Sequence, residues 1–257
     1  MTRKKLWQAC FLVAALAFPA TGAHADEVRV LAAGAAKHAL EEIAPAFERA
    51  SGHTLRAGYD TVGTQRDRVL QAAPGAVADL VVLSDAALQQ LRVADRLQPR
   101  AAVGIGRVVV ALAAPAGTSP LPDISDAAHL RAALQAAPSI AYADPARGAT
   151  AGTHFAKVLD ALDLRAELAP RLTVLPFGVD VINAVAAGKF ALGVSQSSEI
   201  MAAQGVRFVG GLPAPHAQAT GYGAALASGS GAAVALLEFL ATPAAQSAWR
   251  ASGFTAP

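Results

Sequence analysis

Apolar stretches of strand length alternate with segments of helical periodicity along almost the whole chain. Runs of apolar residues predict strands at 28–33, 54–59 and 79–84, and helical spacing of apolar residues predicts helices at 36–47 and about 64–72. The order strand, helix, strand, helix, strand is typical of a parallel sheet whose faces are covered by helices.

The pattern changes at residues 104–117, which form one long apolar strand that breaks at Pro115 and Gly117. A second series of alternating strands and helices then begins. Its predicted strands are 139–144, 171–176 and 190–196, with a helix after the first and a short helix over Val181, Ile182 and Val185. Strands after Gly205 and at 220–227 and two closing helices complete the chain, the last helix with Thr242 as its N-cap.

This layout predicts an α/β fold of two lobes, each a mainly parallel, helix-covered sheet, with a ligand cleft between them. Two crossings near residues 106 and 206 would divide the chain into lobe 1, residues 26–106 plus 206–257, and lobe 2, residues 107–205. Ligands in such sheets bind outside the carboxyl ends of the strands, where helices begin. We therefore expect the functional residues in the strand-to-helix turns.

The first 25 residues differ from the rest and are typical of a signal peptide. Arg3, Lys4 and Lys5 precede an apolar stretch too short to span a membrane, and Ala23-His24-Ala25 fits a signal peptidase site. Cleavage after Ala25 would give a mature chain that starts at Asp26 and contains no cysteine, because Cys10 lies in the leader.

Charge and hydropathy argue against nucleic-acid binding and against membrane insertion. The formal net charge of +2 falls to −1 when the three positive charges of the leader are removed. The mature chain has no cluster of Lys and Arg interleaved with aromatic residues, and no second apolar run long enough to cross a bilayer. We expect an exported protein that binds no nucleic acid and does not insert stably into a membrane.

Catalytic motifs are sparse. The segment "GVSQS" (193–197) lacks the second glycine of a nucleophile elbow, and the chain has neither a Walker loop nor a dinucleotide-binding glycine pattern. The histidines of the mature chain show no metal-site spacing, so no metal or cofactor is expected. A periplasmic hydrolase using His154 or Ser84 remains an alternative, although Ser84 also fits a helix cap.

Four predicted strand-to-helix turns have a composition that favours ligand binding rather than catalysis. They are rich in glycine, small residues and hydroxyl groups, and they span 32–40, 59–67, 144–154 and 176–185. Glycine allows the backbone to approach a ligand closely, and unpaired N–H groups at helix starts can hold an anion. If the four turns face one cleft, they would form an anion-binding site.

Several segments in this order resemble the type II periplasmic solute-binding proteins of ABC importers, in the branch that contains the molybdate-binding proteins. They are "APGAVADLVVLSD" (73–85), "GRVVVALAAPAG" (106–117), "ADPARGATAGTHFAKVLDALDL" (143–164), "AVAAGKFALGVSQSSEI" (184–200) and "LATPAAQSAWRASGF" (240–254). The resemblance covers essentially the whole mature chain. It implies the two-lobed fold of that family and a monomeric, non-enzymatic periplasmic receptor that passes a small anionic solute to an inner-membrane permease.

Carried over from that family, the ligand-binding residues would be Gly34, Ala35, Gly63, Thr64, Gly152, Thr153, Val179 and Gln196. Molybdate-binding relatives usually offer a serine hydroxyl in the first turn and a tyrosine at the position of Gln196, and this chain has neither. Backbone N–H donors could still hold an oxyanion. Arg66 could add a bidentate contact to a carboxylate, or it could pair with Asp67 or Asp60 at the surface.

The ligand hypotheses therefore stay open. A molybdate- or tungstate-type oxyanion is the leading hypothesis on family resemblance. The one metal expected in the site is then the metal atom of that oxyanion. A small organic carboxylate is the first alternative, since carboxylate sites more often recruit arginine. The replaced serine also leaves room for a sensory module that has lost ligand binding.

Overall fold

The computed structural model describes residues 25–99 and 102–256, and the predicted leader up to residue 24 lies outside them. The strands are β1 Glu27–Ala33, β2 Thr54–Asp60, β3 Leu80–Ser84, β4 Ala102–Pro115, β5 Ile140–Ala143, β6 Leu172–Leu175, β7 Leu192–Gln196, β8 Val206–Gly211 and β9 Ala219–Leu226. The helices are α1 Lys37–Ser51, α2 Val62–Gln71, α3 Asp85–Val93, α4 Ala127–Ala136, α5 Thr150–Ala161, α6 Arg165–Leu168, α7 Gly178–Ala186, α8 Ser197–Ala202, α9 Gly231–Leu240 and α10 Pro243–Ala251.

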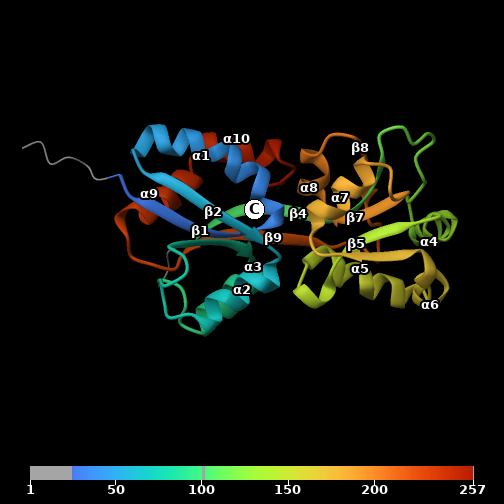
Figure 1. Ribbon diagram of the computed structural model, residues 1–257, viewed down its shortest axis with the longest axis horizontal. Helices are drawn as coiled ribbons and strands as arrows, with labels where there is room; N and C mark the ends of the chain where they lie inside the picture. Colours follow the sequence, from blue (N-terminus) through green and yellow to red (C-terminus); the bar gives the residue numbers. More distant parts are fainter. Residues whose placement is uncertain (1–24, 100–101, 257) are drawn as a thin grey trace, which may run out of the picture.

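The molecule has two lobes, as predicted (Figure 1). In the first, strands lie in the order β2-β1-β3-β9-β4, and in the second β4 lies between β8 and β7, followed by β5 and β6. The pairs within β1–β3 and within β5–β7 are parallel, while every pair that involves β4 or β9 is antiparallel. The predicted α/β architecture is therefore confirmed, but the strand pairs divide evenly between parallel and antiparallel where mainly parallel sheets were expected.

Strand β4 belongs to both sheets. Its first part pairs with β9 as far as Val109, and its last part pairs with β7 and β8 from Val110 onward. The prediction that the chain returns to the first lobe near residue 206 differs from this arrangement. Because β8 pairs with β4 in the second sheet, the return comes after Gly211. An apolar strand pattern identifies a strand but not its partner.

Local sequence explains the main element ends. Gly52 ends α1 with a left-handed φ of 73°, which costs glycine little. Thr242 caps α10 as predicted, because its Oγ1 accepts a hydrogen bond from the Ala245 N–H. The apolar faces of these elements pack into one core in the first lobe, where Trp249 is fully buried, and into two smaller clusters in the second.

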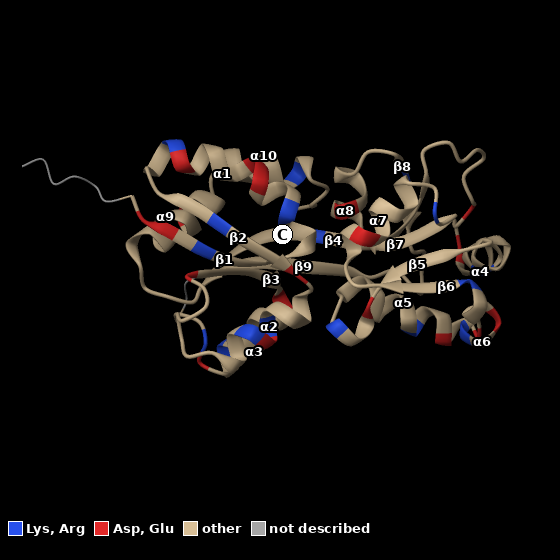
Figure 2. Ribbon diagram, in the orientation of Figure 1, with Lys and Arg blue, Asp and Glu red and all other residues tan. Residues whose placement is uncertain are grey.

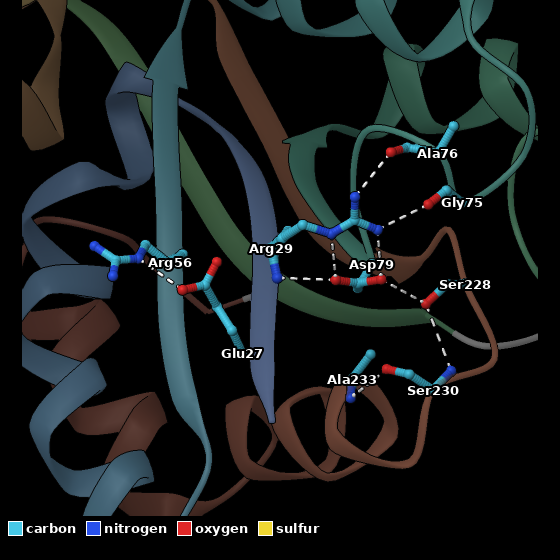
Figure 3. A network of polar contacts seen from close by, with 9 residues as sticks. All are labelled: Glu27, Arg29, Arg56, Gly75, Ala76, Asp79, Ser228, Ser230 and Ala233. Carbon is cyan, nitrogen blue, oxygen red and sulfur yellow. Dashed lines mark hydrogen bonds and ion pairs between the residues drawn. The ribbon is translucent and has the colours of Figure 1, made fainter. Parts of the chain in front are cut away.

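A polar network ties together the amino ends of β1 and β3, where Arg29 and Asp79 lie (Figure 3). The Arg29 guanidinium donates hydrogen bonds to both carboxylate oxygens of Asp79, at 2.9 and 3.0 Å, and to the carbonyl oxygens of Gly75 and Ala76. Ser228 donates to the same carboxylate. These bonds hold the pKa of Asp79 below its usual range, mainly through Arg29.

Figure 2 shows acidic and basic residues interspersed over both lobes.

The two lobes also touch between the start of α2 and the turn after β5. This interlobe contact comprises Asp60, Thr61 and Gly63 from the first lobe and Arg147 and Gly148 from the second. Arg147 donates to Asp60 at 3.1 Å, the Gly63 N–H donates to the Gly148 carbonyl at 3.2 Å, and the Thr61 hydroxyl donates to the Arg147 carbonyl. A Cβ on Gly148 would lie 2.6 Å from the Gly63 Cα, so neither glycine has room for a side chain.

We predict that Gly148→Ala separates the lobes, whereas Gly188→Ala does not. Both glycines have φ near 70°, so both substitutions carry a backbone cost of about 1–2 kcal/mol. An added Cβ at 188 meets no described atom within 4 Å, so only Gly148→Ala also breaks the interlobe contact. Small-angle scattering should show a larger radius of gyration for Gly148→Ala alone. Equal radii for both variants would contradict the role of this contact.

Candidate functional site

A cleft of about 280 Å³ lies between the lobes, at the carboxyl ends of strands from both sheets. Each of the four turns singled out in the sequence contributes to its wall. The lining residues are Ala33, Gly34, Ala35, Lys37, Tyr59, Asp60, Thr61, Val62, Ala143, Ala149, Thr150, Ala151, Phe177, Gly178, Val179, Ser195, Gln196, Glu199 and Tyr222. The cleft therefore stands where ligands bind in open α/β sheets.

Helix starts supply positive potential to this cleft. Helices α5 and α7 begin at its wall, and no described side chain caps their first N–H groups, because Ala149 and Phe177 occupy the N-cap positions. The short 3₁₀ turn Gly34–Ala36 before α1 likewise follows an alanine. Uncapped N–H groups and the helix dipole favour an anion. Helix α2 differs, because the Thr61 hydroxyl and the Gly148 carbonyl already accept bonds from its first turn.

Four of the residues predicted to bind the ligand line the cleft: Gly34, Ala35, Val179 and Gln196. The Gln196 side chain is the unusual one. It is 3% exposed, and its Oε1 and Nε2 atoms have no partner of good hydrogen-bond geometry among the described residues. The Tyr222 hydroxyl lies beside it and beside Thr150. Its nearest polar groups are the Glu199 N–H of the helix start and the Tyr222 hydroxyl, and neither reaches good hydrogen-bond geometry, so the amide can still bond a ligand.

Four other predicted residues face away from the cleft or are already engaged. Gly63 and Thr64 belong to the start of α2, where Gly63 contacts Gly148 and the Thr64 N–H donates to Thr61. Gly152 packs α5 onto β5, because a Cβ there would lie 1.7 Å from the Ala143 carbonyl oxygen. The Thr153 N–H donates within α5 to Ala149. The two glycines thus serve helix packing and lobe contact, and the Thr64 hydroxyl lies beside Thr61 and the Arg147 carbonyl. A glycine- and threonine-rich helix start is compatible with these roles as well as with anion binding.

The sequence left alternative roles open for three side chains, those of Arg66, His154 and Ser84. Arg66 pairs with Asp67 at 2.7 Å and bonds Gln90, so it takes the surface arrangement rather than the cleft. The His154 Nε2 lies 2.7 Å from the His216 carbonyl oxygen. Ser84 caps α3 by accepting from the Ala87 N–H. None of the three lines the cleft, and the hydrolase hypothesis loses the residues on which it depended.

Sequence reasoning missed Glu199, in the first turn of α8. Its carboxyl group lines the cleft and accepts hydrogen bonds from the Ser195 hydroxyl and, at 3.4 Å, from the Gln196 N–H. The one available signal was the spacing of Gln196 and Glu199, since an acidic residue three positions after an N-cap often folds back onto the helix start.

The Glu199 carboxyl lies between helix starts of both lobes. A Cβ on Gly34 would lie 2.9 Å from its Oε1, and a Cβ on Gly178 would lie 2.3 Å from its Oε2. Glycine at these two positions therefore makes space for the carboxyl group. Burial raises the pKa of Glu199, and the bonds from Ser195 and Gln196 only partly oppose this. The cleft thus holds a carboxyl group with an increased tendency to keep its proton.

Lys37, on α1, is the cationic side chain among the described residues that line the cleft. Its Nζ lies 5.8 Å from the centre of the Tyr59 ring and 3.9 Å from Glu41. Its side chain is 44% exposed, so it can turn toward a bound anion. Asp60 also lines the cleft, but it is paired with Arg147. Hydrogen-bond donors, one partly exposed cation and the protonation-prone Glu199 carboxyl make this wall suited to an acidic ligand of several polar groups.

Two further findings concern other classes of site. Within residues 25–99 and 102–256, His, Cys, Asp and Glu form no group of three or more that could hold a metal ion. Within the same residues, no helix combines the length and the apolar character needed to cross a bilayer.

Comparisons with known proteins agree with this architecture. The family model of the bacterial extracellular solute-binding proteins matches residues 28–255. An aconitate isomerase from Pseudomonas sp is 31% identical over 234 residues, which cover 87% of this chain and 86% of the relative.

Solved structures share the fold at lower identity. The periplasmic molybdate-binding protein of Azotobacter vinelandii superposes with a TM-score of 0.72 at 20% identity, covering 90% of this chain and 99% of that one. The sulfate-binding protein SubI of Mycobacterium tuberculosis gives a TM-score of 0.67 at 18% identity, covering 89% and 86%.

We predict that Glu199→Gln stabilises the ligand-free protein, and increasingly so as the pH rises. A carboxyl whose folded-state pKa lies above its unfolded value favours folding at low pH, and that contribution is lost as the pH rises through the folded-state pKa. Lys37, His38, Glu41 and Tyr222 share its cavities, and they remain in the variant. Urea unfolding should give a free energy of unfolding that is slightly higher for the variant than for the wild type at pH 4, and a larger difference at pH 8. A difference that does not grow between pH 4 and pH 8 would contradict a raised pKa for Glu199.

Proposed function

Because the chain belongs to the family of bacterial extracellular solute-binding proteins, we propose that it captures a small organic acid with two or three carboxyl groups in the cleft between its lobes. The observation that carries this proposal is the buried Glu199 carboxyl beside the buried Gln196 amide in the wall of the cleft. A neutral carboxyl donates a hydrogen bond to a ligand carboxylate, whereas an ionised one repels any anion.

Further features support an organic acid. The aconitate isomerase relative is named for a tricarboxylic acid and matches most of this chain. The cleft, at about 280 Å³, approaches the size of small-molecule pockets. The uncapped starts of α5 and α7 and the partly exposed Lys37 give several separate places for carboxylate groups.

A molybdate- or tungstate-type oxyanion is the second candidate, and the uncapped helix starts favour it. Such an ion needs many donors and no opposing charge. Ala35 and Val179 offer it no hydroxyl group, and Glu199 adds an acidic group to the wall. These features favour the organic acid over the oxyanion.

In the cell, the family relationship supports a role as the monomeric receptor of an ABC importer, which passes its solute to an inner-membrane permease. We place the protein in the periplasm on the leader predicted at residues 1–25 and on the family to which it belongs.

We expect citrate, tricarballylate and trans-aconitate to raise the melting temperature of residues 26–257, refolded to remove carried-over ligand. A ligand at about 1,000 times its Kd stabilises a protein by roughly 4 kcal/mol, a shift on the order of 10 °C for a chain of this size. Molybdate, tungstate, sulfate and phosphate serve as the comparison set. A shift with molybdate and tungstate alone would contradict the organic-acid proposal and support the oxyanion receptor.

A further inference from the structure

We propose that a second cavity beside the cleft, walled by α1, α7 and α8, is a subsite for a carboxylate group, and that the ligand is an acid with three carboxyl groups whose third group lies there. This inference rests on the proposed function, because it requires an organic acid in the cleft. It goes further by naming the number of carboxyl groups and the side chains that bind the third.

The first argument is that the two cavities adjoin. The second cavity has a volume of about 190 Å³. It shares five wall residues with the cleft, namely Gly34, Ala35, Lys37, Val179 and Glu199. Cleft and cavity are therefore neighbouring parts of one space between the lobes, and Glu199 stands where they meet. A ligand held in the cleft has room for a further substituent beyond this residue.

A glycine keeps this junction open. A Cβ on Gly34 would lie 2.9 Å from the Glu199 Oε1, so a side chain there would fill the space between the first-lobe turn and the carboxyl group. The Ser195 hydroxyl and the Gln196 N–H both donate to Oε2 and fix the carboxyl group from the other side. With its proton in place, Glu199 can donate to a carboxylate at the junction, as the proposed function requires.

The second argument is a buried hydroxyl group without a partner. Ser198 lines the second cavity and is 2% exposed, and its Oγ has no hydrogen-bond partner among the described residues. A hydroxyl group in this state costs free energy, which a hydrogen bond to a ligand oxygen would recover. Ser198 is not part of the wall of the cleft. Its hydroxyl group therefore indicates a ligand group in the second cavity.

The third argument is the supply of donors that suit a carboxylate. Helix α1 places Lys37 and His38 in the wall of the second cavity, and α7 adds the Asn183 amide. An ammonium group, an imidazole and an amide can each donate a hydrogen bond to a carboxylate. Glu41 opposes an anion here, and the Lys37 Nζ lies 3.9 Å from its Oε1. An exposed pair of this kind contributes little free energy, so Lys37 can turn to a ligand.

These groups favour a tricarboxylate over a dicarboxylate. The uncapped starts of α5 and α7 suit two carboxylates in the cleft, and the second cavity adds a third place beyond them. A dicarboxylate bound at the two helix starts would leave Ser198 and His38 without a ligand group. Because hydrogen bonds to a charged group are stronger than neutral ones, we expect the third carboxylate to increase affinity at least about tenfold.

The test compares three acids by calorimetry. Tricarballylate carries three carboxyl groups, glutarate is the same molecule without the central one, and succinate is a shorter dicarboxylate. The wild type should bind tricarballylate at least about tenfold more tightly than either dicarboxylate. Ser198→Ala should weaken tricarballylate binding at least about fivefold and change the binding of glutarate and succinate less than about twofold.

Ser252→Ala is the matched control. Ser252 is 1% exposed and its Oγ also lacks a partner among the described residues, but it lines neither cavity. This variant should bind all three acids as the wild type does. His38→Ala is a second test at an exposed position, and it should also weaken the binding of tricarballylate alone. Melting temperatures without ligand establish that each variant is folded.

Three results would overturn the subsite and leave the receptor proposal intact. They are equal affinities of the wild type for the three acids, unchanged tricarballylate binding in folded Ser198→Ala and His38→Ala variants, and losses that are the same for all three acids. Failure of every di- and tricarboxylate to bind the wild type would instead overturn the proposed function.

Discussion

Strand β4 is the constraint on which the site depends. It is hydrogen-bonded to β9 along its first part and to β7 and β8 along its last part, so one continuous strand joins the two sheets. The turns after β1 and β2 in one lobe therefore face the turns after β5, β6 and β7 in the other (Figure 1). Segments more than a hundred residues apart in the chain meet in the cleft because this strand fixes where the sheets meet.

Each lobe has one buried carboxyl group whose role follows from its surroundings, Asp79 in the first lobe and Glu199 in the second. Asp79 accepts from the Arg29 guanidinium, the Arg29 backbone and Ser228, so its charge is satisfied within the sheet (Figure 3). Glu199 has two neutral donors and lies in the cleft, so its charge is only partly compensated. The first holds strands together. The second is left to interact with whatever enters the cleft.

Much of the fold could be predicted from the sequence because strand and helix periodicities differ clearly. The run at 79–84 and the long strand ending at Pro115 were recognisable in this way, as was the Thr242 cap. Helices α3, α4, α6 and α8 were not predicted as elements, and of these α6 and α8 have only four and six residues. Strand partners were not predictable, since pairing depends on contacts distant in sequence, and β8 was assigned to the wrong lobe for that reason.

The candidate site was harder to predict, for a related reason. Glycine and threonine at a helix start can bind an anion, pack a helix on a strand or join two lobes, and Gly152 and Gly63 do the latter two. Glu199 was missed because an acidic residue in the first turn of a helix usually acts as a capping residue, and only the three-dimensional arrangement brings it against Gly34.

The most direct measurement is a crystal structure of the protein with trans-aconitate. The account predicts the ligand between the lobes, with carboxylates at the starts of α5 and α7 and a carboxylate oxygen atom within hydrogen-bond distance of the Glu199 carboxyl and the Gln196 amide. A ligand bound outside the cleft, or a Glu199 carboxyl turned away from it, would contradict the central claim that this acidic group sets the chemistry of the site.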